Sequence, residues 1–133
     1  MPVSADWYDK QTREIIFWKI SDKWSPQELH TVYDKTDAMT LTVSHWVHAI
    51  IDMQQADTFP SGVISSVTLR SRADPPNYDM AVIITASPFI RAMCNILATL
   101  NRGNEKFYIV DTLEEALIFV AKRKKILLSY KKN

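Results

Sequence analysis

Residues 80–88 read MAVIITASP, an apolar run that is followed directly by Ser87 and Pro88. A short apolar run without alternation is typical of a strand that is buried on both faces of a parallel sheet. A serine followed by a proline is a helix start, because the serine side chain can cap the first turn and proline at the first helical position lacks only an N–H that would have no partner there. The stretch therefore predicts a buried strand that leads straight into a helix.

The same succession of strand and helix start recurs on both sides of this stretch. Three further pairs are EIIFWKI (14–20) before Ser25-Pro26, HAIID (48–52) before Pro60-Ser61-Gly62, and KFYIV (106–110) before Asp111-Thr112. A short extended segment at 6–9 precedes them and is expected to pair with 14–20 as an antiparallel hairpin. Parallel strands joined by helices give right-handed crossovers. We predict an α/β fold in the order ββαβαβαβα, with about four helices on a mixed, mostly parallel sheet of four to five strands.

Helix ends can be predicted from a few residues. Ser25 with Glu28, and Asp111 with Glu114, have the spacing of a capping box, in which each residue satisfies an amide of the other. Gly103 suits the left-handed position that ends a helix.

The composition predicts one soluble cytoplasmic domain. The chain has 133 residues, which is enough to bury a core without a disulfide or a metal. Its single cysteine, Cys94, lies in an apolar stretch, fits a reducing compartment and is expected to act as a small packed hydrophobe. The N-terminus lacks the basic and apolar regions of a signal peptide, and no apolar run approaches the ~20 residues that a membrane-spanning helix needs.

Charge is unevenly distributed. Residues 1–121 contain 15 acidic and 10 basic residues, a net charge of −5, whereas residues 122–133 contain six Lys or Arg and no acid. We therefore divide the chain into a domain at 1–121 and a basic helix end and tail at 122–133. A solvated helix end, favoured by the helix dipole, is the default explanation of the tail. With Ile126, Leu127 and Leu128 it could also lie on an anionic membrane surface or an acidic partner. Nucleic acid is not expected as a partner, because the rest of the chain is acidic.

No pattern in the chain indicates catalysis, a cofactor or a metal. The only glycines, Gly62 and Gly103, are too far apart for a phosphate-binding loop, and no Gly-x-Ser-x-Gly motif is present. The three histidines, His30, His45 and His48, do not have the spacing of a metal site on one strand face. Asp52 and Asp57 could be considered as an acid and a base, but they fit loop charges better. We expect a non-enzyme.

Three segments together resemble the STAS domain of bacterial anti-sigma-factor antagonists and of sulfate-transporter tails. The first is IIDMQQADTFPSGVISSV, in which Ser61-Gly62-Val63 is similar to the Ser-Gly-Leu part of the family's helix start. The second is VIITASPFIRAM, with Ser87, Pro88, Ile90 and Arg91 at matching positions. The third is FYIVDTLEEAL, which is similar to the last strand and the acidic last helix. The resemblance covers about residues 14–121.

The resemblance implies a regulatory module that binds other proteins, with a kinase-like anti-sigma factor as one partner class. Pro60 stands where phosphorylated family members carry the accepting serine, so Ser61 is the candidate for phosphorylation. The expected partner-binding residues are Asp57, Thr58, Pro60, Ser61, Gly62, Ile64, Ser87 and Pro88. Whether the chain forms a homodimer stays open.

The alternative function is a carrier or sensor of a small apolar ligand or lipid, as some STAS-like proteins are thought to be. The ligand would lie between the helices and the sheet, near the aromatic residues. Of the four tryptophans, Trp18 is expected in the core and Trp24 beside the helix that starts at Ser25. Trp7 and Trp46 could line a pocket, although packing explains them as well.

Overall fold

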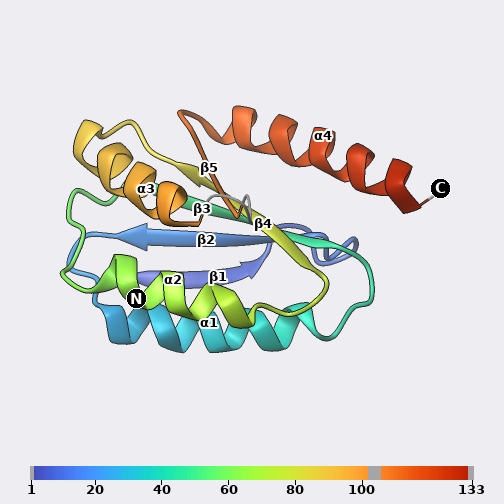
Figure 1. Cartoon of the computed structure of the whole chain (residues 1–133), viewed down its shortest axis with the longest axis horizontal. Coiled ribbons are helices and arrows are strands. Elements are labelled where there is room, and N and C mark those ends of the chain that lie inside the picture. The colour runs from blue at the N-terminus through green and yellow to red at the C-terminus, as the bar shows by residue number, and fades with distance from the viewer. Residues whose placement is uncertain (1, 102–105, 132–133) are drawn as a thin grey trace.

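The computed structural model describes residues 2–101 and 106–131. Five strands and four α-helices alternate in the predicted order, with one short 3₁₀ helix, η1, after α2 (Figure 1). Their bounds are β1 Val3–Trp7, β2 Ile15–Ser21, α1 Pro26–Thr40, β3 Val47–Gln55, α2 Val63–Arg70, η1 Ser71–Ala73, β4 Tyr78–Ile84, α3 Pro88–Leu100, β5 Phe107–Val110 and α4 Leu113–Lys131.

The five strands form one sheet in the order β1-β2-β3-β4-β5. β1 pairs with β2 antiparallel, which confirms the predicted hairpin, although its first strand spans Val3–Trp7 rather than 6–9, and all later pairs are parallel. The fold class and element order predicted from the sequence are therefore confirmed. Because β2 to β5 are parallel neighbours, their carboxyl ends share one edge of the sheet, which lies at the left in Figure 1.

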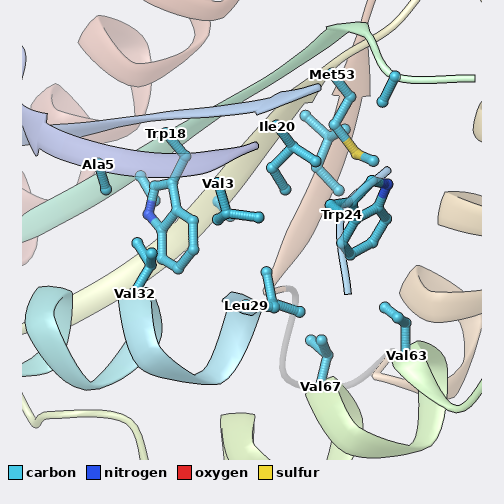
Figure 2. Packing of buried hydrophobic residues seen from close by; sticks show 14 of the residues in the cluster. Val3, Ala5, Trp18, Ile20, Trp24, Leu29, Val32, Met53, Val63 and Val67 are labelled. Carbon is cyan, nitrogen blue, oxygen red and sulfur yellow. The ribbon is translucent and has the colours of Figure 1, made fainter. Parts of the chain in front are cut away.

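Helices cover both faces of the sheet. Right-handed crossovers that move in one direction along a sheet place their helices on the same face. Accordingly α1, α2 and α3 pack together against one face, and α4 packs against the other. Figure 2 shows part of the larger core, with Trp18 and Val3 of the sheet above Leu29 of α1 and Val67 of α2.

The second core lies under α4. Ile50, Val82 and Ile84 of the sheet are completely buried there, against Ala116 and Val120 of the helix. β3 and β4 thus have apolar side chains on both faces, which the uninterrupted run at 80–84 predicted for β4.

The two predicted serine caps are confirmed, but Glu28 bonds to the Ser25 hydroxyl and not, as the predicted capping box requires, to the Ser25 amide. The Ser25 hydroxyl accepts a hydrogen bond from the Glu28 amide at 3.2 Å and donates one to the Glu28 carboxylate at 3.0 Å. The Ser87 hydroxyl accepts from the Ile90 amide at 3.2 Å. Such a cap contributes about 1 kcal/mol.

The predicted cap of α4 is wrong by one residue. The helix begins at Leu113, so Thr112 rather than Asp111 is the cap, and its hydroxyl accepts from the Glu115 amide at 3.1 Å. The Glu115 carboxylate accepts from the Asp111 amide at 3.3 Å, one residue before the cap, so Glu115 rather than Glu114 bonds back to the start of the helix. Gly103 lies outside the described residues. α3 ends at Leu100 and is capped by Asn101, whose side-chain amide donates to the Leu97 carbonyl at 2.9 Å.

None of the helices in residues 2–101 and 106–131 combines the length and apolar character that crossing a bilayer requires.

Candidate interaction site

The two turns that the sequence predicts as a partner surface leave the same edge of the sheet. Asp52 of β3 is the neighbour of Ile84 of β4, so the loop 56–62 and the turn 85–87 follow adjacent parallel strands. The helices that begin there, α2 and α3, contact one another. We call the surface formed by these turns the rim; its residues are Asp57, Thr58, Pro60, Ser61, Gly62, Ile64, Ser87 and Pro88. The structure brings all eight to one end of the molecule (Figure 1).

Rim residues are accessible to a partner. Pro60, Ile64 and Ser87 are partly buried, and the other five residues of the rim are exposed. None of the eight is buried beneath another segment.

A buried tryptophan holds the first turn in place. Trp24 is almost completely buried, and its Nε1–H donates to the carbonyl of Thr58 at 3.0 Å. Its ring meets the ring of Phe59 edge to face, with centroids 5.7 Å apart. Since both contacts fall inside the loop 56–62, the loop is preorganised by the core rather than by a partner. The sequence placed Trp24 beside α1 but did not predict this second role.

Gly62 has a backbone conformation that other residues of the rim could not easily adopt. Its φ is +86°, in the left-handed region that favours glycine, and a Cβ built there would have no atom within 4 Å. The amides of Ser61 and Gly62 donate no hydrogen bond to any described residue. A side chain at position 62 would therefore project into open space at the surface of the rim.

The second turn presents side chains rather than free amides. The Ser87 amide donates to Thr85 Oγ1 at 3.1 Å, and the Arg91 amide donates to the Ser87 carbonyl at 2.9 Å. What remains for a partner is Pro88 and the neighbouring Phe89, whose surface is 51% exposed.

Phe89 begins an exposed apolar stripe on α3. Leu100, near the end of the helix, is 59% exposed, and Ile96 between it and Phe89 is about half exposed. Residues 89, 93, 96 and 100 have helical spacing, so they lie on one side of α3, next to the buried stripe of Ile90, Cys94 and Leu97. The rim therefore continues into apolar surface that sequence analysis missed.

Carboxylates surround the rim. The Asp57 amide donates to Asp22 Oδ1 at 2.7 Å, and the carboxyl groups of the two residues also contact. A hydrogen bond between the two carboxyl groups is the largest cause that raises the pKa of Asp57 above its ordinary value. Repulsion from the Asp22 charge is the next. Asp111, Glu114 and Glu115 follow β5 at the same edge, where Asp111 pairs with Arg91 of α3. The charge favours a basic partner.

Asp22 was missed by sequence analysis, although a signal existed. It directly follows β2, whose last residue, Ser21, neighbours Gln55 of β3, so the same-edge rule places it beside Asp57. Asp52, which was considered together with Asp57, instead accepts from the Gln54 amide at 3.0 Å.

A cavity lies between the three helices and the sheet. Its volume is about 70 Å³, and aromatic residues contribute much of its lining: Trp18, Trp24, Tyr33, Phe59, Tyr78 and Phe107. Cys94 also lines it, and burial raises the pKa of its thiol to about 12. The thiol is therefore protonated at neutral pH.

The cavity has one ionisable end. Asp74 lines it with a side chain that is 4% exposed, and Lys106 Nζ lies 3.3 Å from Asp74 Oδ2. Burial raises the pKa of Asp74 to about 6, against the opposing effect of Lys106. Burial likewise raises the pKa of Tyr33 above its ordinary value. The cavity thus joins an apolar body to a carboxyl group that titrates near neutral pH.

In the described part of the chain, no three His, Cys, Asp or Glu side chains cluster as metal ligands would. Comparison of the chain with models of known protein families and with curated protein sequences finds no match.

Proposed function

We propose that this chain is a non-catalytic regulatory module that binds another protein through the rim, as anti-sigma-factor antagonists of the STAS family do. One observation carries the proposal: two exposed turns of neighbouring parallel strands form one surface, and the core holds the first of them in place through Trp24. Preorganisation of this kind lowers the entropy lost on binding. The carboxylates around the rim favour a partner with a basic surface.

The resemblance to STAS domains suggests the partner class and the switch. A kinase-like anti-sigma factor in the cytoplasm is the proposed partner. Ser61 is the proposed phosphorylation position, since it is exposed and stands next to Gly62. A phosphate there would add up to two negative charges to the surface that the partner covers.

Substitution of Gly62 tests the rim. In Gly62→Arg, a long charged side chain would enter the partner's space, and we expect binding to weaken by about 100-fold, the effect of losing a strong interface contact. Because any side chain is strained at a φ of +86°, Gly62→Asn is the matched control, since asparagine tolerates this conformation best.

The measurement is quantitative capture of proteins from native cell extract, with the unchanged chain and both variants as baits. The expected result is one set of partners that Gly62→Asn retains and Gly62→Arg loses. Equal retention by both variants, or equal loss while both stay folded, would contradict the proposal.

A second candidate function, binding of a small apolar ligand, is favoured by the cavity. Its volume of about 70 Å³ limits the ligand to a few heavy atoms unless side chains move aside, so a small molecule fits better than a lipid chain. Asp74 could accept a hydrogen bond from the ligand's polar group.

The carrier function predicts that a ligand co-purifies with the chain. Native mass spectrometry of protein prepared without detergent should show an added mass, and Ala81→Val, which narrows the cavity from β4, should remove it. A clean mass of the chain alone in repeated preparations would rule out this function.

A further inference from the structure

The opposite end of the molecule carries an open groove. It lies at the amino ends of the parallel strands, between α4 and the loops at 41–46 and 76–77, and encloses about 970 Å³. In Figure 1 α4 continues beyond the sheet at the right, on the side where α1 ends. The last turns of α4 therefore form one wall of the groove with little of the sheet beneath them.

Large apolar side chains are exposed at this end. Trp46 is 40% exposed and Tyr130 69%, and both line the groove with Leu41 and Leu128. Ile126, on the same turns of α4, is also about half exposed. Several such residues at one place mark an interaction surface more often than they occur by chance on a monomer.

This end is also basic. Two acidic residues that face α4, Asp79 and Glu14, form ion pairs with Arg123 and Lys124 of that helix. Lys122 and Lys125 are exposed, and neither forms an ion pair with a described residue. The β1–β2 turn contributes Asp9, Lys10 and Arg13, a further net positive charge.

We propose that this end of the molecule binds the surface of an anionic lipid bilayer. Trp46 and Tyr130 would lie at the level of the headgroups, where rings with one apolar and one polar side are favoured. Leu128 would enter the boundary of the acyl chains, and Lys125, which lies one turn before it on the same side of α4, would meet the lipid phosphates together with Lys122.

The distribution of charge favours a bilayer over an acidic peptide. Among the described residues that line the groove the lysine is Lys124, which is paired with Glu14, so an acidic peptide there would meet a neutralised lysine. Lys122 and Lys125 lie outside the groove lining. Cations that flank an apolar surface match a plane of headgroups better than an extended chain.

Vesicle sedimentation tests this proposal. We expect about tenfold more of the full chain to sediment with phosphatidylcholine vesicles that contain about 30 mol % phosphatidylserine than with pure phosphatidylcholine vesicles. Binding should decrease when the salt concentration is raised to about 0.5 M.

Two double variants with the same change in net charge locate the surface. Lys122→Glu with Lys125→Glu should abolish the preference for phosphatidylserine. The control, Lys19→Glu with Lys23→Glu, reverses two exposed lysines elsewhere and should retain it. Leu128→Ser should weaken binding even at low salt. Gly62→Arg, at the rim, should not change vesicle binding. The membrane proposal can therefore fail or hold independently of the proposal that the rim binds a protein.

Three results would overturn the proposal: equal sedimentation with both kinds of vesicle, equal loss in both double variants, or binding of a poly-glutamate peptide without binding of phosphatidylserine vesicles. Thermal unfolding of each variant identifies any loss that is due to unfolding.

Discussion

Replacement of Asp79 by Asn is expected to lower the free energy of unfolding by about 3 kcal/mol, the usual effect of breaking a buried ion pair. Asp79 Oδ2 lies 3.0 Å from His48 Nε2 and 2.7 Å from Arg123 Nε, and Oδ1 lies 3.0 Å from an Arg123 terminal nitrogen. The His48 side chain is 2% exposed and that of Asp79 9%. Asparagine keeps one acceptor oxygen but loses the other and the negative charge, so the buried imidazole and the guanidinium could no longer both be satisfied.

The effect should depend on pH with a definite sign. Burial opposes ionisation of Asp79, but hydrogen bonds and charge attraction from His48 and Arg123 outweigh it and lower its pKa to about 2. An unfolded Asp titrates near 3.9. The stabilisation is therefore complete above about pH 4 and is lost as the pH falls toward 2.

Urea unfolding of wild type and Asp79→Asn at pH 7 and at low pH measures both effects. Glu14→Gln is the control, because it removes an ion pair with Lys124 whose lysine is about half exposed and should cost less than about 1 kcal/mol. If Asp79→Asn lowers the free energy of unfolding no more than Glu14→Gln does, the buried ion pair of Asp79 with Arg123 does not hold α4 on the sheet.

Asp74 should show the opposite pH dependence. Its pKa in the folded chain is about 6, above the value of about 3.9 in the unfolded chain. Between these values the folded state holds more protons, so this group destabilises the fold increasingly as the pH rises from 4 to 6. Between pH 4 and pH 7, the free energy of unfolding of Asp74→Asn should therefore rise by about 2 kcal/mol relative to that of wild type.

Unfolding of Asp74→Asn and wild type at several pH values across this range is the test. The difference between the two proteins matters rather than either absolute stability, since loss of the Lys106 pair affects Asp74→Asn at every pH. A difference that stays constant with pH, or that moves in favour of wild type, would show that Asp74 is not a buried acid.

The order of elements could be read from the sequence because its signals are local. The run at 80–84 and the caps Ser25 and Ser87 each depend on a few adjacent residues, and each was confirmed. The cap of α4 was wrong by one position because Asp111 and Thr112 are both good caps, and only the packing of Leu113 and Ala116 on the sheet selects between them.

The candidate site could be predicted only in part. Ser61 and Ser87 were expected as partner-binding residues, and they lie at one end of the molecule because each follows one of two neighbouring parallel strands. The contact between Asp22 and Asp57 spans 35 residues, and the exposure of Leu100 depends on which side of α3 meets the sheet. Neither follows from local pattern.

The central claim is that the rim is the surface that contacts a protein partner. Photo-crosslinking in native cells tests it most directly, with a photoreactive amino acid in place of Ser61 and, in a control chain, in place of the exposed Thr31 of α1. The account predicts a discrete protein adduct from position 61 and none from position 31. No adduct from position 61, or the same adducts from both positions, would contradict it.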